Sequence, residues 1–131
     1  MSLFRMSSFL RRVLLADALM SGAAGLLMLL GAGVLTQTLD LPATLLRSAG
    51  LILLSYAAFV VYVANRSQRA MVWAVILINA LWAIDSVVLL LSGWVAPNAL
   101  GYAFVLVQAV AVAVFAELEY VGLRRSEAAI A

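Results

Sequence analysis

Charged side chains inside apolar stretches are the residues of this sequence that could do chemistry. Asp85 lies in the almost wholly apolar stretch 79–94, and Arg47 lies in the apolar stretch 42–64. A charge at the centre of a membrane helix costs ~2.5–3.5 kcal/mol, so such a residue usually faces the protein interior and has a partner. At about 1.5 Å of rise per residue, Arg47 would lie about 7–8 Å and Asp85 about 12 Å from the same membrane surface. We therefore expect the two to pair, either to fix helix register or to line a cavity. In the remaining alternative, Arg47 extends alone to the membrane surface and Asp85 is protonated.

A second group of polar residues lies near the middle of the apolar stretches. Asn79, Trp82 and Ser86 fall on one stripe of a helix, and Gln108 lies at a similar depth. Hydrogen bonds between helices are the structural interpretation of the two amides, and such bonds contribute ~0.6 kcal/mol on average. The functional interpretation is a polar binding site beside Trp82.

The third group lies toward the opposite membrane surface. Asp17 comes just over one helical turn after Arg12, and Glu117 and Glu119 are followed by Arg124. Ion pairing at the interface would explain these carboxylates. The alternative is that Asp17 binds and releases a proton.

Residue composition excludes most other chemistry. The chain has 131 residues, 67% hydrophobic and 11% charged, with no cysteine, no histidine and only arginine as a basic residue. Serine–histidine and cysteine–histidine nucleophiles are therefore impossible, and no glycine-rich phosphate loop or metal-ligand cluster is present. We predict no enzyme activity and no cofactor. The net charge is only +2 and the arginines lie at segment ends, so nucleic acid is not an expected partner.

The elements that must position these residues are membrane helices. About 20 apolar residues cross the hydrocarbon core, and four stretches are long enough: residues 13–35, 42–64, 70–95 and 98–121. The short joints between them predict an all-α bundle of four antiparallel helices in an up-down-up-down order. Asp40 is predicted to cap the second span ahead of Pro42, while Gly93 and Pro97 separate the last two spans.

The distribution of arginine predicts the orientation. Seven of the eight arginines fall on one side of this threading, and Arg47 alone falls on the other. By the positive-inside rule both termini are cytoplasmic, and we expect a multi-pass protein of a bacterial cytoplasmic (inner) membrane. Residues 1–12 are expected to form an interfacial segment or a frayed basic leader, residues 13–121 the transmembrane domain, and residues 122–131 a cytoplasmic tail.

Small residues at helical spacing predict close helix packing. Membrane helices associate through such residues because lipid tails compete equally for leucine. The expected packing positions, against this chain or another copy, are Ser21, Gly22, Gly25, Ala109, Ala113 and Ala116. A weak internal repeat is also visible, because "DAL" at 17–19 and "NAL" at 79–81 are 62 residues apart.

In size and number of spans the chain resembles the small multidrug-resistance exporters, which carry an acid in their first helix. Asp17 is the only residue that matches that position, and the surrounding family pattern is missing. The resemblance is one of architecture and implies a four-helix membrane protein.

Two functions follow from the residues. The favoured one is a structural or accessory subunit that associates with itself or with other membrane proteins. Such a subunit should be a dry, fully packed bundle with exposed small-residue stripes. The alternative is a small oligomeric transporter or a binder of lipid or hydrophobic ligands, which should contain a cavity reaching Asp85 or Asp17.

Overall fold

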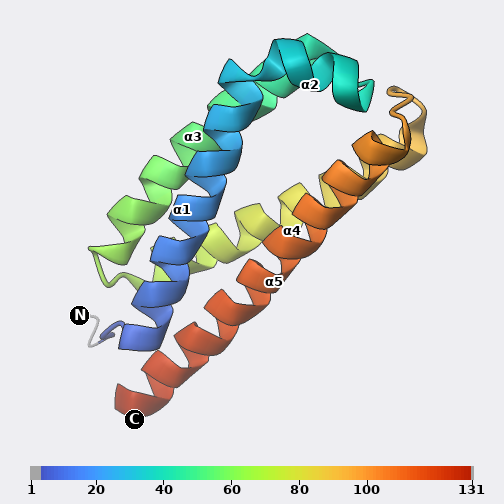
Figure 1. Ribbon diagram of the computed structural model, residues 1–131. Coiled ribbons are helices and arrows are strands. Elements are labelled where there is room, and N and C mark those ends of the chain that lie inside the picture. The colour runs from blue at the N-terminus through green and yellow to red at the C-terminus, as the bar shows by residue number, and fades with distance from the viewer. Residues whose placement is uncertain (1–3, 131) are drawn as a thin grey trace.

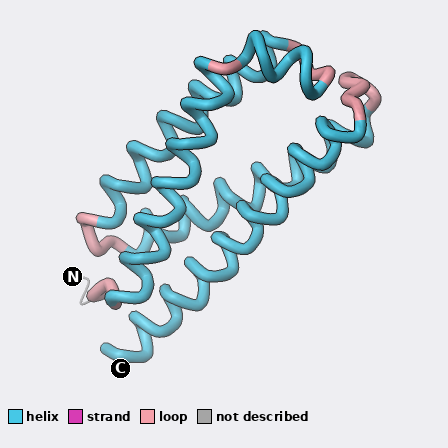
Figure 2. Tube along the Cα trace, viewed as in Figure 1, coloured by secondary structure: helices cyan, strands magenta, loops and turns pink. Residues whose placement is uncertain are grey.

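The computed structural model describes residues 4–130, and these residues form an all-helical chain (Figures 1 and 2). The helices are α1 (Ser8–Leu30), α2 (Ala32–Leu39), α3 (Ala43–Ala64), α4 (Arg69–Ser92) and α5 (Ala99–Ile130). All except α2 are long and apolar enough to cross a membrane. The prediction of an all-α protein with four candidate membrane spans is confirmed.

The first long helix begins earlier than the predicted span. Ser7 is its N-cap, and the Ser7 hydroxyl accepts a hydrogen bond from the Leu10 N–H at 3.1 Å. The Ser7 N–H in turn donates to the Ser126 hydroxyl at 2.9 Å. Residues 8–12, expected in an interfacial segment, are therefore the first turn of α1, and Leu10 is fully buried.

The predicted first span is not one continuous helix. It breaks at Gly31, and the short helix α2 follows and ends at Asp40. Asp40 adopts a left-handed conformation with φ of 56°, which short polar side chains tolerate better than most residues. Asp40 therefore ends α2, and the prediction that it caps the next helix is wrong, because Pro42 occupies that position. Gly93 ends α4 with φ of 81°, which suits its predicted role as a terminator.

The long helices form two pairs. In the first helix pair α1 packs on α3, and in the second α4 packs on α5 (Figure 1). The pairs approach each other where α1 meets α5, near the end of the molecule that carries both termini. At the other end, Asn98 joins them: its N–H donates to the Leu39 carbonyl at 3.2 Å, and its side-chain amide donates to the Thr38 carbonyl at 2.8 Å.

The first helix pair is held at close range by two glycines. A Cβ on Gly25 would lie 2.8 Å from the Gly50 carbonyl oxygen, and a Cβ on Gly50 would lie 2.7 Å from the Gly25 carbonyl oxygen. Any side chain at either position would push the backbones apart. Gly22 faces Ala57 on the same interface. The small-residue stripe of the first span is therefore occupied within the chain.

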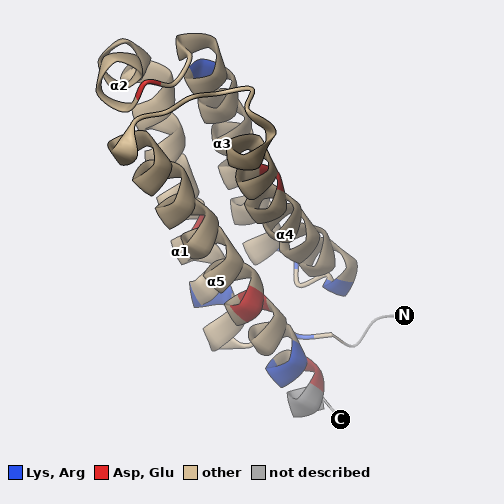
Figure 3. Cartoon of the chain, turned by 90° about the vertical axis from the view of Figure 1, so that its right-hand side faces the viewer, with Lys and Arg blue, Asp and Glu red and all other residues tan. Residues whose placement is uncertain are grey.

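The predicted packing positions on α5 are covered unequally. Ala109 is buried, Ala116 is partly buried against the core, and Ala113 is exposed. Large apolar side chains such as Leu30 and Leu91 are about four-fifths exposed, at 79% and 81%, which suits contact with lipid tails. The arginines gather toward the end that carries both termini, with one near the opposite end (Figure 3).

Candidate functional site

A buried network of polar side chains joins the two helix pairs. The Asp17 carboxyl group accepts hydrogen bonds from the Tyr56 hydroxyl at 2.7 Å, the Asn79 amide at 2.9 Å and the Ser21 hydroxyl at 3.0 Å. The Asn79 amide also donates to the Glu119 carboxyl group at 2.7 Å. These five residues, here called the polar junction, come from all four long helices.

The polar junction is closed off from its surroundings. Asp17 is 1% exposed, Asn79 2% and Glu119 0%. Apolar side chains pack around it, including Leu14 of α1 and Val60 of α3. A buried polar group is costly unless it is hydrogen-bonded, so this network strongly favours one register of the four helices.

Ion pairing at the interface was predicted for the junction carboxylates, and that prediction is wrong. Among the described residues neither Asp17 nor Glu119 forms an ion pair. The reason is helical register, since both side chains turn inward while Arg12 and Arg124 remain exposed. Glu117 is also exposed, as expected for a residue two positions from an inward-facing one. Glu119 Oε2 is buried without a hydrogen-bond partner.

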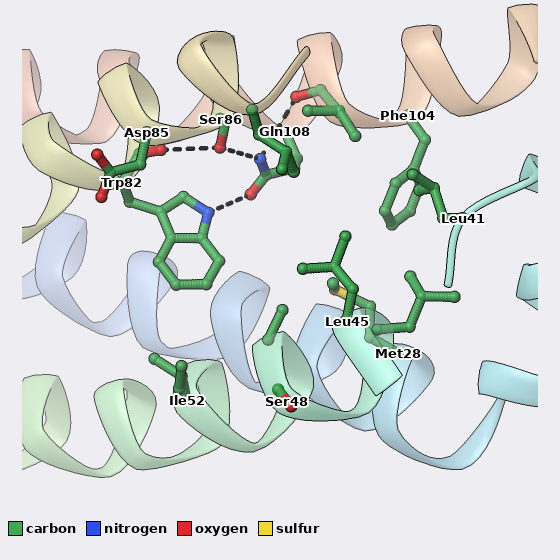
Figure 4. A pocket seen from close by; sticks show the side chains of 14 residues that line it. Met28, Leu41, Leu45, Ser48, Ile52, Trp82, Asp85, Ser86, Phe104 and Gln108 are labelled. Carbon is green, nitrogen blue, oxygen red and sulfur yellow. Dashed lines mark hydrogen bonds between the residues drawn. The ribbon is translucent and has the colours of Figure 1, made fainter. Parts of the chain in front are cut away.

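A cavity of about 310 Å³ separates the two helix pairs beyond the junction (Figure 4). Met28, Leu45 and Ile52 line it from the first helix pair, and Phe104 lines it from α5. The helix pairs thus meet tightly at the polar junction and leave space between them at this level. The molecule is not the fully packed bundle expected for an accessory subunit.

One side of the cavity carries a hydrogen-bonded polar wall, formed by Trp82, Ser86 and Gln108, and Asp85 lies at its edge (Figure 4). The Trp82 indole N–H donates to the Gln108 carbonyl oxygen at 2.6 Å. The Gln108 amide donates to the Ser86 hydroxyl at 3.0 Å, and that hydroxyl donates to the Trp82 carbonyl at 2.8 Å. These bonds fix the Trp82 ring and the Gln108 amide in one orientation.

Asp85 and Arg47 are not brought together. Both side chains are exposed, and within residues 4–127 no ion pair joins them. Arg47 belongs to the first helix pair and Asp85 to the second, and Asp85 lines the cavity between the pairs. The predicted Arg47–Asp85 pair is therefore not formed, and among the described residues Asp85 lies at one edge of the cavity lining without a cation (Figure 4).

The weak sequence repeat contained a usable signal. Asp17 and Asn79 occupy matching positions 62 residues apart, and they are hydrogen-bonded to each other across the two helix pairs. Tyr56 binds Asp17 and Glu119 binds Asn79. These two residues are 63 positions apart, so the offset of 62 extended from Tyr56 reaches Leu118, one residue short of Glu119.

The arrangement limits which ligands could be held. Across the part of the chain with described side chains, no group of three or more His, Cys, Asp or Glu residues could hold a metal ion. The junction contains two carboxyl groups, and the cavity combines an apolar interior with one carboxyl group on its wall. No protein-family model, curated protein or solved structure matches this chain.

Proposed function

We propose that this protein crosses a lipid bilayer with four antiparallel helices and binds an amphiphilic small molecule between its two helix pairs. The single observation that carries the proposal is the cavity of about 310 Å³ with a polar wall along one side. The arginine distribution supports cytoplasmic termini. A bacterial cytoplasmic membrane is the proposed location.

The polar wall, more than the apolar surface, should decide which molecule binds. A ligand that enters from the bilayer moves out of lipid tails, which are as apolar as leucine. Its hydrocarbon part therefore gains little free energy by entering the cavity. Its polar end gains a hydrogen bond, and hydrogen bonds to charged groups contribute roughly 1.5–3 kcal/mol. The Gln108 amide is already engaged by Trp82 and Ser86. Asp85 is the charged residue of the cavity lining, to which Ser48 adds a neutral hydroxyl, so we propose a ligand with an alkyl body and a donor group such as an amine.

Calorimetric titration of the protein in lipid nanodiscs tests this proposal with two probes, dodecylamine and dodecanol. We expect dodecylamine to bind about tenfold more tightly, since that ratio corresponds to about 1.4 kcal/mol. Asp85→Asn should remove the preference. Ala49→Phe places a ring at the cavity lining and should weaken both probes.

Ala103→Phe on the exposed face of α5 is the matched control and should leave both affinities unchanged. Equal binding of both probes to the unmodified protein would contradict the role of Asp85. Affinities that are the same in the Ala49→Phe and Ala103→Phe variants would contradict the cavity as the binding site.

The second candidate function is that of a structural or accessory subunit, and one observation concerns the surface that would dock its partner. The stripe that was expected to dock a partner, around Gly22 and Gly25, packs against α3 of the same chain. Of the predicted packing positions, Ala113 on α5 is the one left exposed for a second copy or another subunit. Purification in mild detergent with native mass measurement distinguishes the candidates: an accessory subunit is recovered in a stoichiometric complex, and a ligand binder is recovered with a bound amphiphile.

A further inference from the structure

We propose that the polar junction binds one proton, carried by Glu119, while Asp17 is ionised. The inference goes beyond the proposed ligand site and does not depend on it, because the two sites share no residue. It rests on an inventory of donors and acceptors in the junction and on one buried atom without a partner.

The donors of the junction are all used. Asn79 supplies two amide hydrogens, one to Asp17 and one to Glu119, while Ser21 and Tyr56 each supply one hydroxyl hydrogen to Asp17. Asp17 therefore accepts three hydrogen bonds, which suits an ionised carboxylate. Glu119 accepts one.

Glu119 Oε2 identifies the missing hydrogen. This atom is fully buried and has no hydrogen-bond partner, although its side chain points into the junction and its other oxygen is bound to Asn79. An ionised carboxylate is an acceptor only, whereas the acid form adds one O–H donor. Asp17 and Glu119 accept hydrogen bonds from the same Asn79 nitrogen, at 2.9 Å and 2.7 Å, so their carboxyl groups lie next to each other. A proton on Glu119 thus supplies the donor that the junction lacks and removes the repulsion between two buried charges.

No other charged group whose side chain the structure describes neutralises the two carboxyl groups of the junction. The titratable groups that face Glu119 are Asp17 from α1 and Tyr56 from α3, while α4 contributes the neutral amide of Asn79. Among the described side chains, no arginine reaches either carboxyl group to form an ion pair. If Glu119 lost its proton, two carboxylates would lie side by side and share the same hydrogen-bond donors. Their repulsion would favour separation of the two helix pairs.

Infrared spectroscopy of the full chain, reconstituted in phosphatidylcholine vesicles and labelled with ¹³C-glutamate, tests the proposal. The chain has three glutamates, Glu117, Glu119 and Glu127. At neutral pH we expect one isotope-shifted band from a protonated carboxyl group. Glu119→Gln should abolish this band, because glutamine has no carboxyl group, and it should still fold because glutamine is isosteric with the neutral acid. Glu117→Gln, two residues away and exposed, is the matched control and should keep it.

Two results would overturn the proposal. One is a spectrum of the unmodified protein in which all glutamates are ionised at neutral pH, as expected if a buried water or a sodium ion occupies the junction. The other is a band that survives Glu119→Gln. If that variant does not fold, the band must survive both Glu117→Gln and Glu127→Gln, which assigns it to Glu119 by elimination. Its loss in either of these two variants contradicts the proposal.

A stability measurement gives a second readout. A proton bound by the folded state and released on unfolding makes stability fall as pH rises. The unfolding temperature of the unmodified protein should therefore fall as pH rises above the range in which an exposed glutamate titrates, and should level off where the band disappears. That of Glu119→Gln should stay constant over the same range. Parallel pH profiles for the two proteins would contradict proton binding at Glu119.

Discussion

The polar junction and the cavity lie between the same two helix pairs and use similar side chains, yet one is closed and the other is open. In the junction, polar residues from α1, α3, α4 and α5 bind one another across the interface. In the polar wall, Trp82, Ser86 and Gln108 bind one another within α4 and α5. Polar residues thus close a membrane interface only where each helix pair supplies partners for the other. Where one pair satisfies its own polar groups, the opposing face carries mostly apolar side chains and space remains.

This difference assigns separate roles to the two regions. Hydrogen bonds between helices fix how the pairs meet, so the junction determines the relative position of α1 and α5. The hydrogen bonds of the polar wall need nothing from the first helix pair, and in the proposed function the neighbouring Asp85 carboxyl group accepts a hydrogen bond from the ligand. Variants of the junction should change stability most, and variants of the wall should change binding most.

Replacing Asn79 with leucine should give the largest loss of stability. The change removes both hydrogen bonds that the amide donates to Asp17 and Glu119. We expect a loss of about 3 kcal/mol, since the hydrogen bond to ionised Asp17 contributes roughly 1.5–3 kcal/mol and the one to neutral Glu119 roughly 0.5–1.5 kcal/mol. Reversible unfolding in mixed micelles measures it. The matched control is Asn65→Leu at the exposed end of α3, where the amide binds only a carbonyl of its own helix. Equal losses of stability in Asn79→Leu and Asn65→Leu would show that the junction contributes no more to stability than an exposed amide does.

Replacing Gly50 with alanine should give the next largest effect. A Cβ at this position would lie 2.7 Å from the Gly25 carbonyl oxygen and 2.7 Å from the Leu29 nitrogen, so α1 and α3 must separate. Overpacking of this kind costs about 1–3 kcal/mol. The same unfolding experiment applies. Gly33→Ala is the control, because no atom lies within 4 Å of the added carbon. An unfolding free energy unchanged by Gly50→Ala would mean that the first helix pair is not closely packed.

Replacing Trp82 with phenylalanine should reduce stability by only about 1 kcal/mol, because one hydrogen bond within the second helix pair is lost. It leaves the Gln108 carbonyl oxygen without its donor. We expect the Gln108 carbonyl oxygen to become available to ligands. The difference in affinity between dodecylamine and dodecanol, measured by calorimetry, should then become smaller. Trp94→Phe serves as the control, since this side chain is 87% exposed. A larger stability loss than that of Asn79→Leu would reverse the roles of the two regions.

Replacing Glu127 with glutamine should have the smallest effect. Glu127 forms an ion pair with Arg69, whose side chain is 56% exposed. Exposed ion pairs contribute roughly 0–1 kcal/mol and are screened by salt. We expect a change below about 0.5 kcal/mol that vanishes at high ionic strength. A salt-independent loss comparable to that of Asn79→Leu would show that charges outside the junction also hold the helix pairs together.

The sequence predicted the helices better than their contacts. Long apolar runs specify membrane helices because every backbone group must be satisfied internally in lipid. The break at Gly31 was missed because glycine is common in such helices and apolar residues continue on both sides. The partners of Asp17 were missed for a different reason. Depth was estimated for each residue, but depth does not give rotation about the helix axis. Glu119 was therefore assigned to the membrane surface, although it is fully buried.

The most direct test of the account is solid-state NMR of the protein in lipid bilayers, with ¹⁵N in asparagine side chains and ¹³C in carboxyl groups. The account predicts that the Asn79 amide nitrogen correlates with the carboxyl carbons of both Asp17 and Glu119. Those two signals should disappear in Asn79→Leu and persist in Asn65→Leu. An Asn79 amide that correlates with neither carboxyl carbon in the unmodified protein would contradict the polar junction, and with it the proposed closure between the two helix pairs.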